Sequence, residues 1–224
     1  KALHRRENTW CTFHSPILPD PCKHLPSYLA ANYSHPEWLI QRWTGRYGKE
    51  KTIEICKTNN LAPTLFLRVN QRKISIEEFI VLLDQKGISS HTVRNAVAVD
   101  DIAVSEIPGF AEGLFFVQDI SAMKVVSFLN AEKSHTVLDL CAAPGGKATH
   151  IAELLEGTGR IYALDISFKR LQLVKENCLR MGIHNAALVC GDASENRAPF
   201  HMQFDRVLID APCSNTGVLA RRVE

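Results

Sequence analysis

Apolar residues change their spacing along the chain, and each spacing predicts a different element. Over 65–69 they fall at every second position, which predicts a strand. Over 76–83 they recur at i, i+3, i+4 and i+7, which predicts a helix that ends at Gly87. Valines over 93–99 predict one further strand. Together these elements indicate a small α+β domain that docks on a neighbour.

Two helices are expected before this domain. Pro36 in a first turn and apolar residues at helical spacing up to Tyr47 predict the first helix, which Gly48 ends. A second helix is expected over 49–59. Residues 1–33 are rich in proline and histidine, and we interpret them as a linker or the frayed tail of an earlier domain.

From residue 116 onward, short apolar runs alternate with helical patterns. The runs are continuous, as in a parallel sheet covered by helices. The expected elements are strands at 136–140, 160–165, 186–190 and 204–209, and helices at 118–130, 146–155 and 167–181. The predicted fold class is α/β, with a doubly wound, Rossmann-like domain built on a parallel sheet. Only four of its strands are visible, so we expect a C-terminally incomplete domain and a longer parent protein. The predicted domains are 1–33 (linker or tail), 34–115 (helical hairpin with the small α+β domain) and 116–224 (Rossmann-like domain).

Composition narrows the class of protein. Of 224 residues, 46% are hydrophobic and 22% charged, which excludes a disordered, collagen-like or coiled-coil chain. No run approaches the ~20 apolar residues of a membrane span, and no secretory signal opens the chain, so we expect a cytoplasmic protein without membrane contact. Seven scattered cysteines form no CxxC pair, and we expect no metal. Residues 1–75 carry 12 Lys and Arg against 5 Asp and Glu, a surplus that suits a polyanion such as RNA.

Acidic residues follow the end of each predicted parallel strand: Asp139, Asp165, Asp192 and Asp210. The carboxyl ends of parallel strands share one edge of a sheet, where ligands of such folds bind. One acid there would be an ordinary capping residue. Four of them indicate a binding site.

The loop 141–147 after the first strand of that sheet selects among nucleotide-like ligands. It reads Cys-Ala-Ala-Pro-Gly-Gly-Lys, and Cys141 and Ala148 break the Walker pattern. It also lacks G-x-G-x-x-G, which disfavours the alternative of a nicotinamide-dependent oxidoreductase. Asp165 can accept hydrogen bonds from a ribose diol, and Asp192 can receive an adenine amino group. Adenine and ribose without a phosphate cradle indicate S-adenosylmethionine as the cofactor.

Asp210-Ala-Pro-Cys213 lies where the methyl acceptor is expected. Carbon 5 of a pyrimidine becomes nucleophilic after a thiolate adds to carbon 6, so a cysteine there suits a cytosine substrate. Asp210 could hold the N3/N4 edge of the base, and Lys147 could orient Asp210. On its own Cys213 would more often be a small buried hydrophobic residue.

At these motifs the sequence resembles the Sun/Fmu (RsmB-like) family of RNA cytosine-5 methyltransferases. The resemblance covers most of the chain. It includes the loop 140–147, the stretch 165–171, Gly191-Asp192, the stretch 210–217, Val117-Gln118-Asp119 and the stretch 38–48.

The resemblance implies methyl transfer from S-adenosylmethionine to cytosine carbon 5 in RNA, most of all small-subunit ribosomal RNA. The implied cofactor contacts are Cys141, Ala142, Ala143, Pro144, Gly145, Gly146, Lys147, Asp165, Asp192 and Asp210. The implied catalytic residues are Cys213, Asp210 and Lys147. Cys213 would assist release of the methylated base, and the nucleophile would lie in a later Thr-Cys-Ser motif, which this sequence does not contain. A transfer RNA methyltransferase and a non-catalytic RNA-binding protein are the alternatives, and the oligomeric state is open.

Overall fold

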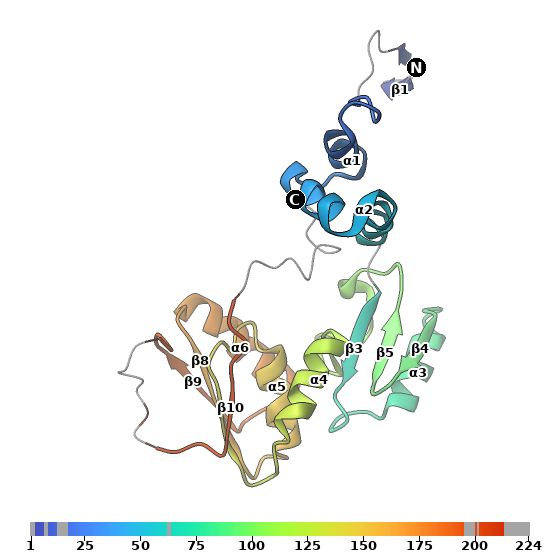
Figure 1. Cartoon of the computed structure of the whole chain (residues 1–224). Helices are drawn as coiled ribbons and strands as arrows, with labels where there is room; N and C mark the ends of the chain where they lie inside the picture. The colour runs from blue at the N-terminus through green and yellow to red at the C-terminus, as the bar shows by residue number, and fades with distance from the viewer. Residues whose placement is uncertain are drawn as a thin grey trace. The chain divides into compact units, whose positions relative to one another are not determined.

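The computed structural model describes residues 3–6, 9–12, 18–61, 64–194, 200 and 202–212. They fall into two compact units, one within 1–63 and one within 64–214 (Figure 1). Each unit is described by itself. Among the described residues, no helix is both long enough and apolar enough to cross a membrane.

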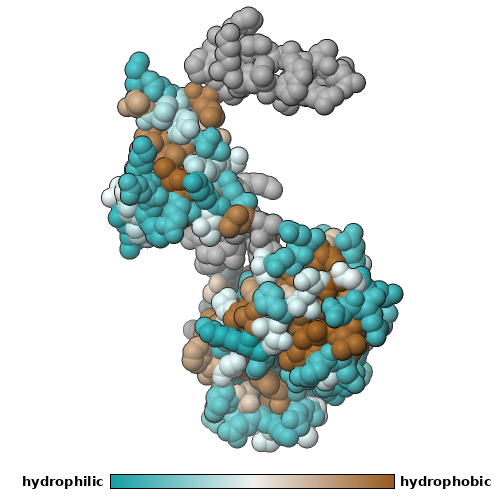
Figure 2. Space-filling view, turned by 90° about the vertical axis from the view of Figure 1, so that its right-hand side faces the viewer, coloured by the Kyte–Doolittle hydropathy of each residue, from teal (hydrophilic) through white to brown (hydrophobic). Residues whose placement is uncertain are grey.

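The first unit is a short hairpin followed by two helices. Strands β1 (Leu3–Arg6) and β2 (Thr9–Thr12) pair antiparallel. Helix α1 spans Leu25–Tyr33, and α2 spans Glu37–Asn59 with a break at Gly48, where φ is 78°. That break confirms the predicted end of one helix and start of the next. Hydrophobic side chains of α1 and α2 form a small core. Hydrophilic residues cover much of the molecular surface that Figure 2 shows.

Helix α1 lies within residues 1–33, which we interpreted from the sequence as a linker or the tail of an earlier domain. Pro26 lies in the first turn of α1, where proline is tolerated because its missing N–H would have no helical partner. Leu29 of α1 is buried in the small core. The many prolines nearby concealed this helix.

The second unit begins with an antiparallel sheet in the order β4-β5-β3-β6. Its elements are β3 (Leu65–Val69), α3 (Ile76–Gln85), β4 (Ser90–Val93), β5 (Ala96–Val99), a 3₁₀ turn (Val104–Glu106) and β6 (Phe115–Val117). Ser75 and Glu78 form a capping box at the start of α3. We call β3–β6 the small sheet.

Two details of the small sheet differ from the prediction. The single strand expected over 93–99 is a hairpin of β4 and β5, because Arg94 turns the chain with a φ of 58°. Strand β6 pairs with β3, with Leu67 opposite Val117, so hydrogen bonds of this sheet continue past residue 116.

The second sheet is parallel, in the order β10-β7-β8-β9. Its elements are α4 (Ile120–Leu129), β7 (Thr136–Asp139), α5 (Gly146–Leu154), β8 (Arg160–Asp165), α6 (Phe168–Met181), β9 (Ala186–Cys190) and β10 (Arg206–Leu208). Ser167 caps the start of α6 and Gly182 its end, both as predicted. This arrangement confirms the predicted α/β Rossmann-like fold class.

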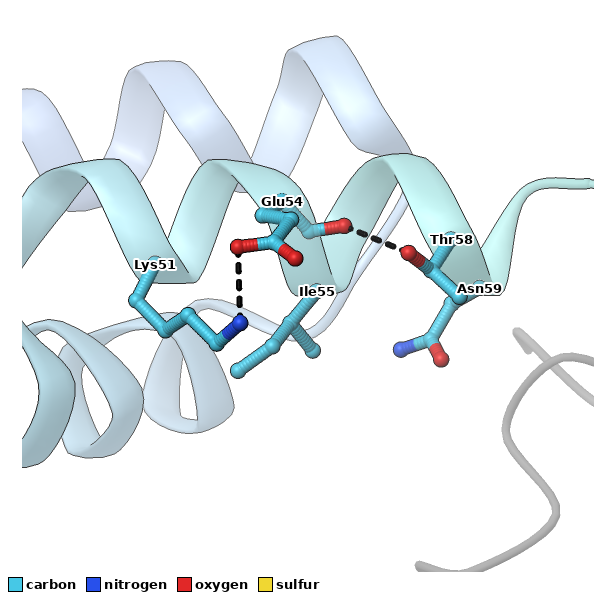
Figure 3. Close-up of a pocket in the computed structure, with 5 residues that line it drawn as sticks. All are labelled: Lys51, Glu54, Ile55, Thr58 and Asn59. Carbon is cyan, nitrogen blue, oxygen red and sulfur yellow. Dashed lines mark hydrogen bonds and ion pairs between the residues drawn. The ribbon is translucent and has the colours of Figure 1, made fainter.

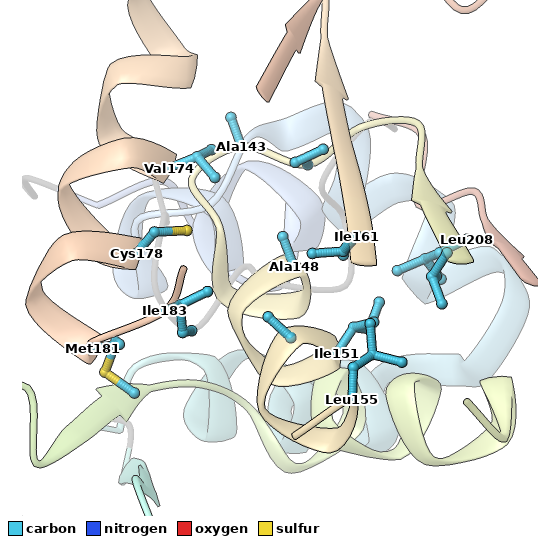
Figure 4. Close-up of a cluster of buried hydrophobic side chains, with 14 of the residues drawn as sticks. Ala143, Ala148, Ile151, Leu155, Ile161, Val174, Cys178, Met181, Ile183 and Leu208 are labelled. Carbon is cyan, nitrogen blue, oxygen red and sulfur yellow. The ribbon is translucent and has the colours of Figure 1, made fainter. Parts of the chain in front are cut away.

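The core of the parallel sheet lies between the strands and the helices α5 and α6. Figure 4 shows Ile151 of α5 and Leu155 directly after this helix, Val174 and Cys178 of α6, and Ile161 of β8 in this cluster. All but Cys178 are at most 3% exposed. The packed core fixes the strand ends from which the site is built.

The strand order places the topological switch point between β7 and β10. From β7 the chain proceeds to β8 and β9 on one side, and then returns to place β10 on the other. The loops that follow β7 and β10 therefore diverge, and a crevice is expected at the carboxyl ends of these two strands.

Candidate functional site

The loop 141–147 connects β7 to α5 at this carboxyl edge. Hydrogen bonds from neighbouring elements hold its backbone. Among them are Ala142 N–H to Leu164 O (2.9 Å), Arg170 Nη2 to Ala143 O (2.7 Å) and Asn177 Nδ2 to Pro144 O (3.0 Å). Strand β8 and helix α6 thus fix the loop before any ligand arrives.

Gly145 shows why glycine is needed where the loop enters α5. Its φ is 108°, a left-handed conformation that side chains rarely adopt, and a Cβ would lie 3.3 Å from Cα of Val174. The chain therefore turns close against α6. The free backbone N–H groups of the first turn of α5 then point toward the carboxyl edge, where they favour negative or polar ligand atoms.

Asp165 ends β8 and is 2% exposed. Its Oδ2 accepts from the N–H of Ala143 at 3.2 Å, and its Oδ1 accepts from the N–H of Ser167 at 3.0 Å. Arg170 Nη1 lies 3.4 Å from Oδ2. Asp165 therefore joins the loop 141–147 to the start of α6, and each oxygen keeps a second lone pair.

Asp139 ends β7 and is 1% exposed. Burial raises its pKa from 3.8 to about 6, and the negative charges of Asp210 and Asp165 contribute, while Lys147 opposes the shift. Its Oδ1 accepts from the N–H of Cys141 at 3.3 Å. Within the described residues its buried Oδ2 has no hydrogen-bond partner. A buried carboxylate oxygen without a partner is costly and marks a place for a donor.

Lys147 and Asp210 form an ion pair across the switch point. Lys147 belongs to the first turn of α5, and Asp210 follows β10. Their side chains are 22% and 51% exposed. The structure therefore brings together the two residues that the sequence paired, on loops that flank the expected crevice.

The remaining predicted residues differ in what the structure shows of them. Asp192 follows β9, and its Oδ1 accepts from the N–H (2.8 Å) and hydroxyl (2.7 Å) of Ser194, which lowers its pKa. Burial and nearby carboxylates raise the pKa of Cys141, which favours the neutral thiol. Cys213 lies outside the described residues.

Sequence reasoning did not include Asp139 or Arg170 among the site residues. Asp139 was counted among the acidic strand ends, but its burial and unpaired oxygen come from packing below the loop. Arg170 lies five residues after Asp165, in the first turn of α6. That spacing was the available signal, because the first turn of a helix after a strand faces the same edge.

Two hollows of the described surface lie elsewhere. One follows α2 and is lined by Lys51, Glu54, Ile55, Thr58 and Asn59 (Figure 3). The other lies at the amino ends of β8 and β9, opposite the carboxyl edge, and includes Arg72, Arg160 and His184. Over the ranges described, no three His, Cys, Asp or Glu residues come together as a metal site would require.

The fold and these strand ends define the class of Rossmann-like methyltransferases. Residues 126–224 match the family model of the 16S rRNA methyltransferase RsmB/F, and residues 35–104 match the ferredoxin-like domain of the RsmF/B-like methyltransferases. The chain belongs to the RsmB/F family, as the resemblance predicted.

Named relatives support this assignment. The chain is 41% identical to the ribosomal RNA small subunit methyltransferase B of Pasteurella multocida over 84% of this chain and 43% of the relative. The protein of the same name from Proteus mirabilis is 42% identical over 85% of this chain and 46% of the relative. A crystal structure of a protein named PH0851 is 31% identical, with a TM-score of 0.79, over 90% of this chain and 46% of the other. The chain thus spans less than half the length of these relatives.

Proposed function

We propose that this chain is part of an S-adenosylmethionine-dependent methyltransferase that modifies carbon 5 of a cytosine in small-subunit ribosomal RNA, in the cytoplasm. The observation that carries the proposal is the carboxyl edge of the parallel sheet. There the glycine turn of loop 141–147, two buried carboxylates and the Lys147–Asp210 pair lie together. The relatives named for small-subunit ribosomal RNA support the substrate.

The residues present fit the methyl donor. Asp165 would accept from the ribose hydroxyls with its remaining lone pairs, and Asp192 would receive the adenine amino group. The unpaired Oδ2 of Asp139 fits a protonated amino group, which S-adenosylmethionine carries on its methionine part. The loop 141–147 would lie along the ligand, where glycine permits close approach. When bound, the cofactor supplies an electrophilic methyl group.

The acceptor side would use the residues that follow β10. Asp210 would accept from the exocyclic amine of cytosine, and the ion pair with Lys147 would orient Asp210. Cys213 would assist release of the methylated base. The target cytosine must leave its stack to expose carbons 5 and 6, as in other enzymes that act on a base. The surplus of basic residues over 1–75 would contact the RNA phosphates.

Calorimetric titration of the chain with S-adenosylmethionine, with NAD in parallel, tests the cofactor. We expect binding of S-adenosylmethionine alone, and Asp165→Ala should weaken it because ribose hydroxyls lose their acceptor. Unchanged affinity in that variant would contradict the ribose assignment. Binding of NAD alone would overturn the proposed function.

In a longer protein that contains the Thr-Cys-Ser motif, Cys213→Ala tests the acceptor chemistry. We expect slow release of product or a trapped protein–RNA adduct on small-subunit ribosomal RNA. Normal turnover without an adduct would remove the role proposed for Cys213.

A further inference from the structure

Arg68 of the small sheet is a buried cation that reaches the start of α5. On β3, Leu67 and Val69 point into the core of the small sheet. Arg68 lies between them, so its side chain leaves the opposite face. Arg68 is nevertheless only 4% exposed. A guanidinium buried this deeply needs partners for its N–H groups.

Three of those partners belong to successive turns of α5. Arg68 Nη1 donates to the carbonyl of Gly146 at 2.7 Å, and Nη2 donates to the hydroxyl of Thr149 at 2.9 Å. Glu153 balances the charge, with its Oε2 3.3 Å from Arg68 Nε. Gln118, just after β6, also accepts from Nη1. The guanidinium thus binds one helix at three successive levels.

The contacts continue into the loop 141–147. The hydroxyl of Thr149 donates to the carbonyl of Gly145 at 2.7 Å while it accepts from Arg68. Gly145 and Gly146 are the residues through which the loop becomes α5. Lys147, the cation of the exposed pair with Asp210, follows directly. Arg68 therefore contacts the glycine turn from the side of the small sheet, while Asp165 and residues of α6 bind the backbone of the loop at Ala143 and Pro144.

We propose that Arg68 is a positioning residue of the methyl-donor site: the small sheet fixes the glycine turn of loop 141–147 through the Arg68–Thr149 contact. This inference rests on the proposed function and adds a role for the small sheet. Arg68 touches carbonyl and hydroxyl groups behind the loop. It acts on a ligand only through Gly145, Gly146 and Thr149.

A second connection between the small sheet and the parallel domain provides a matched control. Asn70 follows β3 and is fully buried, and its Nδ2 donates to the carbonyls of Gly113 (3.0 Å) and Met181 (2.9 Å). Met181 is the last residue of α6, one turn beyond Asn177, whose side chain holds Pro144 of the loop. A variant at Asn70 therefore weakens docking of the small sheet without removing a contact to the glycine turn.

The experiment compares Arg68→Lys, Thr149→Val, Thr149→Ser and Asn70→Ala in the full chain. Calorimetry gives the dissociation constant for S-adenosylmethionine, urea unfolding gives stability, and hydrogen exchange reports opening at residues 141–149. We expect Arg68→Lys and Thr149→Val to weaken binding at least about tenfold and to speed exchange in the loop. Thr149→Ser keeps the hydroxyl and should restore both. Asn70→Ala should lose stability while its dissociation constant stays within about twofold of the original.

Two results would overturn the inference. One is a loss of affinity in Asn70→Ala as large as in Arg68→Lys at equal loss of stability, because docking alone would then explain it. The other is unchanged loop exchange in Arg68→Lys and Thr149→Val. If the unaltered chain fails to bind S-adenosylmethionine, the proposed function fails, and hydrogen exchange still decides whether Arg68 positions the loop.

Discussion

Two ion pairs of the 64–214 unit join residues distant in sequence, and they differ in burial. The side chains of Arg68 and Glu153 are 5% and 12% exposed, whereas those of Lys147 and Asp210 are 22% and 51% exposed. A buried pair cannot exchange its partner for water without a large cost, but a half-exposed pair can. The first pair is therefore a fixed connection between the small sheet and α5. The second is accessible to solvent, so a ligand can compete for either partner.

The largest effect is expected from breaking the buried connection. Arg68→Met would leave Glu153 buried without its cation and Gly146 and Thr149 without a donor. Burial already raises the pKa of Glu153, and Arg68 opposes that rise. We expect a loss of about 3–5 kcal/mol in the free energy of unfolding, measured by urea denaturation. A loss below about 1 kcal/mol would show that the connection does not hold the two domains together.

Asp139 should show a conflict between stability and binding. Its pKa in the folded chain is about 6 against an ordinary 3.8, so the folded state binds the proton more tightly. Ionisation of Asp139 therefore destabilises the fold increasingly from pH 4 to pH 6 and fully above that. Asp139→Asn should be more stable than the original chain by up to about 3 kcal/mol above pH 6, with no difference below pH 4. It should also bind S-adenosylmethionine more weakly.

Urea unfolding of both proteins between pH 3.5 and 8 gives this difference directly. A stability difference that is constant across the whole range would contradict the raised pKa. Tighter cofactor binding by Asp139→Asn would contradict a role for its free oxygen.

A comparison of two glycines distinguishes the cost of a steric clash from the cost of backbone strain in the free energy of unfolding. Gly113 and Gly87 have nearly equal φ values of 67° and 72°, but a Cβ on Gly113 would lie 1.9 Å from the carbonyl oxygen of Arg180, whereas nothing surrounds Gly87 within 4 Å. Gly87→Ala should cost about 1 kcal/mol, the price of strain alone, and Gly113→Ala at least about 2 kcal/mol. Thermal unfolding measures both. Equal losses would show that the contact between Gly113 and Arg180 of α6 relaxes freely.

The smallest effect is expected at the exposed pair. Lys147→Gln removes a cation whose partner is half exposed, so the free energy of unfolding should change by less than about 1 kcal/mol. Binding of an RNA substrate should weaken more than stability does. A loss above 2 kcal/mol in urea unfolding would place this pair in the same class as Arg68–Glu153.

The strand ends of the parallel sheet were predictable because local rules act there without competition. Asp139, Asp165 and Asp210 each follow a continuous apolar run, and parallel strands bring such positions to one edge. Ser167 and Gly182 marked both ends of α6 for the same reason. Fold class and the candidate residues at this edge thus follow from the order of apolar runs and polar ends.

The role of Arg68 could not be predicted in the same way. In an alternating strand a polar residue between Leu67 and Val69 indicates a solvent-exposed face. Its burial depends on α5, whose residues lie 78 or more positions later. The turn at Arg94 was not predicted for a related reason: nothing in the sequence marks an arginine that adopts a positive φ.

The sequence separation of these contacts affects how the chain is made. During synthesis the small sheet is made before the parallel domain. Arg68 can bind Glu153 only after 85 further residues are made, and Asn70 can bind Met181 only after 111. Until then the emerging small sheet carries a cation and an amide without their buried partners. Its final packing must be delayed until α6 is complete, so the small sheet is synthesised before the contacts that fix it can form.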